Sequence, residues 1–277
     1  IRDLFGVELN VTDRFPTELI GSSGFENSYN TLFLQSSLME RYIGAAQSIL
    51  ELALPAEPSS AIHWRTREII YIETPGAYVG EDKAAEAVLA NFMGRAYRRP
   101  TESMEVKQAV AQFTQARAEG LSYESAIKQV LQTVLISPKF LLRVEVGRDG
   151  KESYPVSDFE LASRLSYFLW ATMPDQELFD LAKEGKLSDQ TVLRNQVFRM
   201  LEDQKANTLG DVFAAQWLGF HNVGTRIWLD PIDNPWCTAS LMTAMRDETS
   251  MFFMSLLRGD SPIRNLIDSD YTFVNEE

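Results

Sequence analysis

The clearest folding signals in the chain lie in residues 157–186, SDFELASRLSYFLWATMPDQELFDLAKEGK. Ser157 and Glu160 have the spacing of a capping box, in which each side chain accepts a hydrogen bond from a backbone N–H that the helix start leaves unpaired. A helix is therefore predicted to begin here. Its apolar residues recur at helical spacing and include aromatic residues that widen the apolar face. They are Phe159, Ala162, Leu165, Tyr167, Phe168, Leu169 and Trp170.

A second helix is predicted directly after the first. Pro174 ends the first helix and suits the first turn of the next one. Asp175 and Glu177 then favour a helix N-terminus, while Lys183 and Gly185 favour its C-terminus. Because so little of the first helix is polar, we expect the pair to be central in the fold.

The apolar face of the first helix is expected to lie in the core. We predict that Leu165, Phe168 and Leu169 are mostly buried and that Trp170 packs at the turn made by Pro174. Exposure of this face would indicate an interface instead. None of these residues has the pattern of a known catalytic site.

Helical periodicity continues on both sides of this pair. Pro55, Pro100, Gly120 and Pro138 mark the ends of neighbouring helices, because proline disfavours a helical conformation before it and glycine closes a helix readily. The predicted helices outside the pair cover residues 38–52, 81–99, 101–120, 122–137, 192–201, 209–218 and 238–257, with shorter ones at both ends of the chain.

Two segments favour strands instead. Residues 68–71, EIIY, and 140–146, FLLRVEV, are rich in β-branched and aromatic residues and would pair as one small two-stranded ribbon. The predicted fold class is therefore all-α, a compact assembly of about nine or ten helices with room for that ribbon. We expect an N-terminal helical segment with long loops at 1–80, a three-helix segment at 81–150 and a C-terminal helical segment at 151–277, with 81–277 packed as one unit.

The composition is that of an acidic globular protein. The chain has 277 residues, of which 45% are hydrophobic, so it is long enough to bury a large core. Its 26 Lys and Arg against 39 Asp and Glu give a net charge of -13. An acidic surface repels phosphate, so we expect no nucleic-acid partner, whereas a basic protein partner is compatible. Solubility is the simpler explanation of the excess acid.

Cysteine and histidine are scarce. The single Cys237 excludes an intrachain disulfide, and no Cys-x-x-Cys-His is present to attach haem. His63 and His221 lie far apart in the sequence, so structural roles are favoured over a metal site or a catalytic triad. No apolar run approaches the roughly 18 residues that a membrane span needs, and no signal-peptide pattern is present. The start IRDLFG, without an initiator Met, indicates a piece of a longer or processed protein.

A cluster of basic residues ends the helix predicted at 81–99. The phrase RAYRRP places Arg95, Arg98 and Arg99 together at the helix C-terminus, where guanidinium groups favour the negative end of the dipole and can cap carbonyls. One interpretation is a site for a carboxylate or phosphate ligand. The structural alternative, which we favour, is that the arginines join helices through buried Asp or Glu partners.

Two pairs of acidic residues lie near the C-terminal end, Asp247 with Glu248 and Asp268 with Asp270. Carboxylates at such spacing could form a metal site or an acid–base site. Adjacent acids on a helix point in different directions, however, so Asp247 and Glu248 do not easily face one ligand. A solvated face is the favoured interpretation.

Four of the five tryptophans lie in the second half of the chain, and core packing explains most of them. Trp228 and Trp236 differ because they belong to a loop rich in Pro and Asp. Tryptophan is enriched at binding hot spots. These two residues are therefore candidates for a partner interface.

Several longer phrases together resemble one family. They are IRDLFG, GFEN, RAYRRP, ISPKFLLRVE, LASRLSYFLWATMPDQEL, RMLEDQKA, QWLG, RDETSMFF and DYTFVNEE. In this order they resemble the planctomycete-cytochrome-associated proteins, which are built from consecutive domains of unknown function, many of them fused to a c-type haem domain. The resemblance spans nearly the whole chain and implies no particular reaction.

The resemblance implies a structural or interaction module of a secreted protein in the periplasm or cell envelope. The expected partner is a cytochrome c domain or a larger complex within an electron-transfer or redox assembly. No cofactor is expected within this chain, and haem c would lie in a missing segment or in a partner. The alternative is an extracellular hydrolase or oxidoreductase with a site between helical lobes, which would use Arg95, Arg98 or Arg99 to bind anions and an acid such as Glu248.

Overall fold

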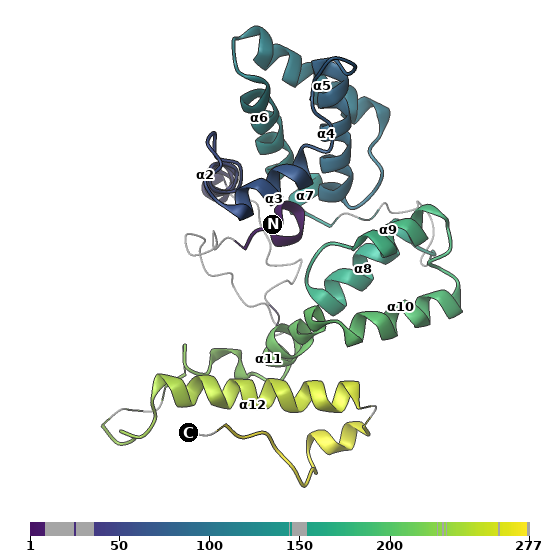
Figure 1. The fold of residues 1–277 in the computed structure, drawn as a ribbon. Coiled ribbons are helices and arrows are strands. Elements are labelled where there is room, and N and C mark those ends of the chain that lie inside the picture. The colour runs from purple at the N-terminus through teal and green to yellow at the C-terminus, as the bar shows by residue number, and fades with distance from the viewer. Residues whose placement is uncertain are drawn as a thin grey trace. The chain divides into compact units, whose positions relative to one another are not determined.

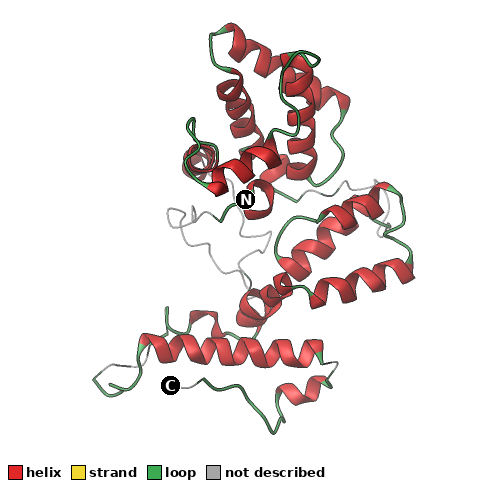
Figure 2. Cartoon of the chain, viewed as in Figure 1, coloured by secondary structure: helices red, strands yellow, loops and turns green. Residues whose placement is uncertain are grey.

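The computed structural model confirms an all-α fold (Figures 1 and 2). It describes residues 1–8, 25, 36–143, 145, 154–225, 227–228, 230, 232–259 and 261–275. Within these residues nine α-helices have eight residues or more, and the only β-type pairing is one isolated bridge between Val223 and Ile227. The predicted number of about nine or ten helices is therefore close to the number observed.

The chain divides into two compact units. Among the described residues, unit 1 extends from residue 1 to Glu160, and unit 2 begins at Leu161, inside helix α8 (Asp158–Trp170). Phe25 lies within a stretch that belongs to unit 2. This division separates residues 81–277 into two units, whereas the sequence led us to expect that they would pack as one.

Unit 1 is a helical bundle. Its helices α4, α5 and α6 contact one another in all three pairs, and α2 packs on α6. The small helices α1 and α7 both contact α4. The elements of unit 1 are α1 (Arg2–Phe5), α2 (Ser36–Ala53), α3 (Ala61–Ile70), α4 (Glu81–Tyr97), α5 (Ser103–Ala118), α6 (Tyr123–Leu135) and α7 (Pro138–Leu141).

The core of unit 1 follows from the apolar spacing of α4 to α6. Residues three and four apart share one helix face, so the apolar positions of each helix meet those of its neighbours. Each buried leucine, valine or phenylalanine side chain stabilises the fold by about 1.5–3 kcal/mol relative to its exposed state. Side chains that are almost completely buried include Val88, Leu89, Phe92, Phe113, Ile127 and Leu131.

The predicted ribbon is wrong. Residues 68–70 belong to α3, which begins at Ser60, where the serine Oγ accepts a hydrogen bond from His63 N. Phe140 and Leu141 belong to α7, which Pro138 opens at its first turn. A serine cap at each helix start satisfies free backbone N–H groups, and this local signal outweighs the strand-like composition of EIIY and of the start of FLLRVEV. Val144 and Val146 of the second run lie outside the described residues.

Unit 2 is built along the long helix α12, with short irregular helices packed on it. The π-helix η3 and the 3₁₀-helix η5 both contact α12, and η3 continues into α11. After α8 the elements are α9 (Gln176–Lys183), α10 (Gln190–Glu202), η2 (Gln204–Asn207), η3 (Leu209–Ala214), α11 (Ala215–Trp217), η4 (Phe220–Asn222), α12 (Ala239–Arg258) and η5 (Ile263–Leu266).

The predicted helix pair exists as α8 and α9. The capping box is confirmed: Ser157 N donates to Glu160 Oε2 at 2.8 Å, and Glu160 N donates to Ser157 Oγ at 3.3 Å. The chain leaves α8 at Ala171, whose φ of 52° is left-handed, and so before Pro174. Asp175 then caps α9 with its side chain. The first turn of α9 therefore begins after the proline.

Burial of the α8 face is only partly as predicted. Leu169 and Trp170 are buried, and Leu165 is half-buried. Phe168 is 62% exposed, so its predicted burial is wrong. Its ring instead packs edge-on against Phe213, with the ring centroids 6.1 Å apart. The aromatic residues near the end of α8 extend around the helix, and only one side of it faces the core.

Trp170 anchors α8 to α10. Its indole N–H donates to Met200 O at 2.8 Å. The cations of Arg199 and Lys205 lie 5.5 and 4.8 Å from the centre of its ring. Arg199 also forms an ion pair with Asp175 at 2.7 Å, which links α10 to the cap of α9. This set of contacts holds the three helices together at one point.

Candidate functional site

The arginine cluster at the end of α4 lies within unit 1, and each of its three guanidinium groups meets protein oxygen atoms. Arg95 Nη2 donates to Asp3 O at 2.6 Å, which connects α4 to α1. Arg98 adopts a left-handed conformation, with φ of 60°, and ends α4.

Arg98 caps two helix ends at once. Its Nη1 donates to Ala96 O and Phe140 O, both at 3.1 Å, and its Nη2 donates to Lys139 O and Leu142 O, both at 2.8 Å. The residue is only 6% exposed. Carbonyl oxygens at a helix C-terminus lack partners within the helix and carry the negative end of its dipole. The buried cation therefore stabilises the ends of both α4 and α7.

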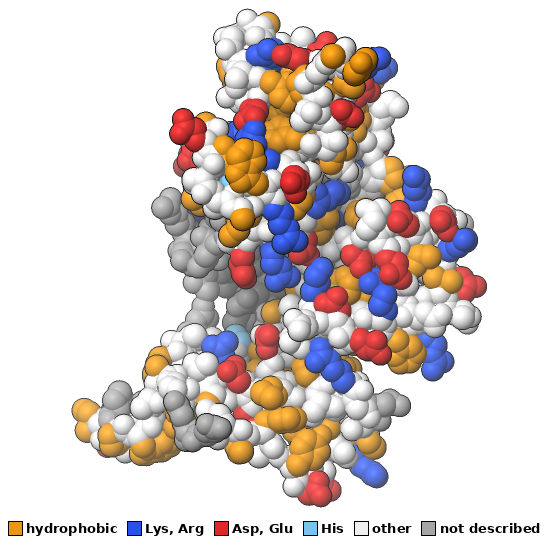
Figure 3. Space-filling model, in the orientation of Figure 1, with side chains coloured by type: hydrophobic (Ala, Val, Ile, Leu, Met, Phe, Trp, Pro, Cys, Tyr) orange, Lys and Arg blue, Asp and Glu red, His pale blue; other side chains and the backbone are white. Residues whose placement is uncertain are grey.

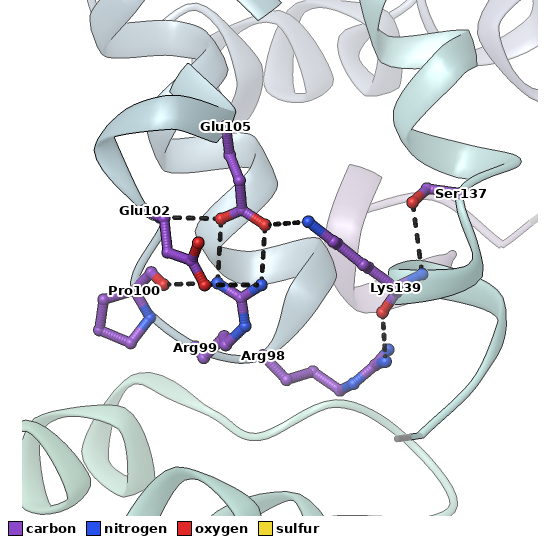
Figure 4. A network of polar contacts seen from close by, with 7 residues as sticks. All are labelled: Arg98, Arg99, Pro100, Glu102, Glu105, Ser137 and Lys139. Atoms are coloured by element: carbon purple, nitrogen blue, oxygen red, sulfur yellow. Dashed lines mark hydrogen bonds and ion pairs between the residues drawn. The ribbon is translucent and has the colours of Figure 1, made fainter. Parts of the chain in front are cut away.

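Arg99 belongs to a second polar network, which centres on Glu105 of α5 (Figure 4). Its Nη1 donates to Glu105 Oε2 at 3.0 Å and its Nη2 donates to Oε1 at 2.7 Å. Lys139 Nζ lies 2.5 Å from Oε1, and Glu102 N donates to Oε2 at 2.8 Å. The hydrogen bonds from Arg99, and then those from Lys139 and Glu102, lower the pKa of Glu105 to about 2, although burial opposes them.

Arg99 pairs with a buried acid, as the sequence led us to expect, whereas Arg95 and Arg98 bond to backbone carbonyls and not to Asp or Glu side chains. Arg95, Arg98 and Arg99 join α4 to α1, α7 and α5, and Glu105 supplies the buried acid. An anion ligand would have to compete with these protein acceptors for the same guanidinium groups. The cluster therefore gives no support to an enzyme that uses these arginines to bind substrate.

Unit 2 contains a groove of about 480 Å³ on one face of α12. Its floor follows a helical spacing of three and four residues along α12, and its other walls come from the stretch around η2 and η3 and from the segment after η5. The lining residues are Asn207, Asp211, Asp247, Ser250, Met251, Met254, Ser255, Arg258 and Phe273.

A close contact between η3 and α12 shapes this groove. A Cβ atom added to Gly210 would overlap Ser250 Oγ and lie 3.0 Å from Met254 Cγ, so only glycine allows this approach. Ser250, which is buried, donates to Asp211 Oδ1 at 2.5 Å. The π-helical turn at η3 widens the helix locally, and such turns are frequent at functional sites.

The acidic pairs do not converge. Asp247 lines the groove, whereas Glu248 Oε1 accepts a hydrogen bond from Thr272 Oγ1. Asp268 and Asp270 are exposed after η5. In the part of the chain that the structure describes, no group of three or more His, Cys, Asp or Glu residues could hold a metal ion.

The two histidines form hydrogen bonds with residues close to them in the sequence, and the cysteine is a free thiol. His63 Nδ1 accepts a hydrogen bond from Ser59 N at 3.2 Å. His221 Nδ1 lies 3.2 Å from Ala215 O, and its Nε2 lies 2.8 Å from Asn222 Nδ2. Cys237 is a half-buried free thiol. These contacts are those of structural side chains.

Trp228 and Trp236 lie in a loop before α12 that exposes several large apolar side chains. We call the described residues between 223 and 238 the tryptophan loop. Trp228 is 48% exposed, Trp236 is 60% exposed and Ile232 is 88% exposed. Asp230 and Asp233 are exposed in the same loop. Figure 3 shows hydrophobic side chains gathered at this end of unit 2, at the lower left of the view.

The sequence did not indicate the groove. In the sequence Asp247 stands out only as a neighbour of Glu248, and Asp211, Ser250 and Arg258 belong to no recognisable motif. The available signal was the spacing of Asp247, Met251, Met254 and Arg258 along one helix face, where two polar ends enclose an apolar middle. A glycine inside a helical pattern, at position 210, was a second signal.

Comparison with known proteins gives domain families but no described function. The model of PSD3, a protein of unknown function (DUF1587), matches residues 1–55; that of PSD5, a protein of unknown function (DUF1595), matches 84–145; and that of PSD4, a protein of unknown function (DUF1592), matches 156–277. No curated protein and no solved structure matches the chain. No helix among the described residues is long and apolar enough to cross a membrane.

The fold and these matches define an all-α chain made of consecutive domains of unknown function. Their order along the chain, DUF1587, DUF1595 and DUF1592, is consistent with the resemblance to the planctomycete-cytochrome-associated proteins that the quoted phrases indicate.

Proposed function

We propose that this chain is a structural and interaction module of a secreted assembly and that it docks onto a basic partner protein through the tryptophan loop. The observation that carries the proposal is the exposure of Trp228 and Trp236 beside Asp230 and Asp233. Tryptophan is among the residues most often found at the energetic centre of protein interfaces. Apolar side chains grouped on a surface and rimmed by polar residues are typical of such interfaces.

Hydrogen bonds join several described residues of the tryptophan loop to one another. Asp230 Oδ1 accepts from Ile232 N at 2.9 Å, and Asp230 O accepts from Asn234 N at 2.8 Å. Trp228 Nε1 donates to Thr225 O at 3.1 Å. Side chains and backbone groups that are restrained before binding lose less conformational entropy on binding, so more of the contact energy appears as affinity.

Charge favours a basic partner. The loop exposes two aspartates, and the whole chain has a net charge of -13. Opposite charges on the two surfaces would speed association and select the correct partner. We infer that the partner is a c-type cytochrome domain, with haem c held by that partner or by another segment of a longer protein, in the periplasm or cell envelope. The family resemblance and the acidic loop support this assignment.

Calorimetry of the purified chain with a basic c-type cytochrome tests the proposal, with an acidic c-type cytochrome as the comparison. We expect binding to the basic protein only, and we expect it to weaken as salt is added. The double change Trp228→Ala and Trp236→Ala should weaken binding about 30-fold or more, as expected for hot-spot residues. Tyr78→Ala is the matched control because Tyr78 is a fully exposed aromatic residue in unit 1.

Two results would overturn the proposal. One is equal binding by the double variant and the unchanged chain. The other is the absence of binding to the basic cytochrome at low salt, where electrostatic attraction is strongest.

A further inference from the structure

The groove on α12 is separate from the tryptophan loop and has unused hydrogen-bonding capacity. Among the described residues, the side chains of Asn207 and Asp247 make no hydrogen bond or ion pair, although both line the groove. Asp211 uses its Oδ1 to accept from Ser250, and no described residue donates to its Oδ2. These groups are available to a ligand.

Opposite charges lie at the two ends of the groove. Asp247 and Arg258 are eleven positions apart on α12, and at 1.5 Å per residue this separates them by about 16 Å along the helix axis. Asp211 lies near the Asp247 end because it contacts Ser250. Arg258 is held in place by Leu201 O and Asp203 O, at 3.1 and 3.3 Å, and its Nη1 has no partner in the described chain.

The middle of the groove is apolar and adaptable. Met251 and Met254 lie between Asp247 and Arg258 along α12, and Phe273 also lines the groove. Methionine side chains fit ligands of different shape, because the unbranched thioether has several accessible conformations. The volume of about 480 Å³ lies within the range typical of small-ligand sites.

We propose that this groove binds a short extended peptide with free ends. The amino group of the peptide meets Asp211 and Asp247, its carboxylate meets Arg258, and its apolar side chains cover Met251, Met254 and Phe273. An extended chain rises about 3.3 Å per residue, so about four or five residues span the 16 Å between the charged ends. The Asn207 amide can both donate to and accept from a peptide backbone.

A peptide with free ends would contact more of the groove's charged and apolar groups than a simple amine or a simple carboxylate would. A simple organic amine would satisfy the acidic end but leave Arg258 without a ligand group. A simple carboxylate would pair with Arg258 but leave the acidic end without a ligand group. At the acidic end it would be repelled by Asp211 and Asp247. A molecule with both charges at a separation of about 16 Å matches both ends.

The test is a titration of the full chain, followed by NMR or calorimetry, with the tetrapeptide Ala-Leu-Leu-Ala. Three forms are compared: free at both ends, acetylated at the amino end, and amidated at the carboxyl end. The free form should bind most tightly, and blocking either end should weaken binding about fivefold, as expected for the loss of one partly exposed charged contact. n-Hexylamine serves as the probe for a site that recognises only an amine.

Protein variants add a second, independent readout. Asp247→Asn should weaken the preference for the free amino end, since Asp211 remains, while keeping the preference for the free carboxylate. Arg258→Gln should remove the preference for the free carboxylate while keeping that for the free amino end. Asp233→Asn is the control, since it removes one acid from the tryptophan loop and leaves the groove unchanged. Because each variant is judged by its preference between peptide forms, a general loss of stability does not imitate the expected result.

Equal binding of the free and blocked peptides would overturn the proposal. So would binding of n-hexylamine as tight as that of the free peptide, or no binding of any form at millimolar concentration. The peptide experiments contain no cytochrome and the cytochrome experiments contain no peptide, so failure of the groove is distinguishable from failure of the docking loop.

Discussion

Replacing Glu105 with glutamine should destabilise unit 1 in a pH-dependent way. The glutamine keeps the shape of the side chain but removes the charge that Arg99 and Lys139 share. It also places an amide group where at least one donor from Arg99, Lys139 or Glu102 now points. The variant therefore loses charge-assisted hydrogen bonds and leaves two cations without their shared partner.

The size of the effect follows from the pKa of Glu105. Folding lowers this pKa from 4.5 to about 2. Each pKa unit corresponds to about 1.4 kcal/mol, so the charged carboxylate contributes about 3 kcal/mol to the folding free energy at neutral pH. Arg99 is 33% exposed and Lys139 is 52% exposed, and solvent screening at these partners reduces our expected value to about 2 kcal/mol.

The pH dependence has a definite sign. Because the pKa is lower in the folded state, the contribution of Glu105 is complete above its unfolded pKa and is lost as the pH falls from about 4.5 towards about 2. The difference in free energy between the original chain and Glu105→Gln should therefore shrink over this interval. At neutral pH it should be constant.

Hydrogen exchange of the α5 and α6 amides measures this difference within unit 1 alone, which matters because a chain of two units need not unfold in one step. Glu102→Gln is the matched control, since Glu102 is 72% exposed and lies 3.9 Å from Arg99; we expect less than about 0.5 kcal/mol. Equal effects of the two variants at pH 7, or a difference that does not change between pH 5 and pH 2.5, would refute the reasoning.

Two further changes test other contacts. Gly210→Ala should destabilise unit 2 by about 1–3 kcal/mol in a urea titration, because the added methyl group overlaps Ser250. The control is Gly44→Ala on α2, where nothing lies within 4 Å, and it should be neutral or slightly stabilising. Equal effects of the two changes would contradict the close contact at Gly210. Arg98→Lys should speed hydrogen exchange of the α7 amides about tenfold or more, since one ammonium group cannot donate hydrogen bonds to carbonyls at both helix ends. An unchanged exchange rate would show that the guanidinium group does not cap α7.

The parts of the fold that the sequence predicted are those that depend on local signals. The capping box of Ser157 and Glu160 forms because both partners lie within one turn. Thr238 and Ser122 likewise cap helices at the predicted places, α12 and α6. Capping residues of this kind lie next to the helix starts that they predict, so they are enough to predict an all-α chain.

The errors arose where a local pattern admits two structures. The run EIIY has the composition of a strand, but Ser60 begins a helix upstream and Tyr71 N still donates to Arg67 O at 2.7 Å. Phe168 is apolar and lies in the right helix, yet it faces Phe213 at the surface and not the core. Whether a side chain is buried depends on which residues pack against it in the folded chain, and Phe213 lies far from Phe168 in the sequence.

The candidate sites show the same difference between local signals, which the sequence carries, and tertiary contacts, which it does not. The arginine cluster was visible as a phrase, but its acceptors were not, because Phe140 and Leu142 lie more than forty positions from Arg98. The groove brings together η2, α12 and the segment around Phe273. Only the tertiary structure brings such residues together, so their joint chemistry could not be predicted from spacing along the chain.

The position of Trp170 gives the protein two optical populations of tryptophan. Trp170 is 1% exposed and lies against two cations, whereas the other four indoles are about half exposed or more. A soluble quencher should therefore extinguish most of the fluorescence and leave one shielded emitter whose signal reports on the junction of α8, α9 and α10. The residual emission thus follows the integrity of that junction without any added label, even while the exposed tryptophans are covered by a partner.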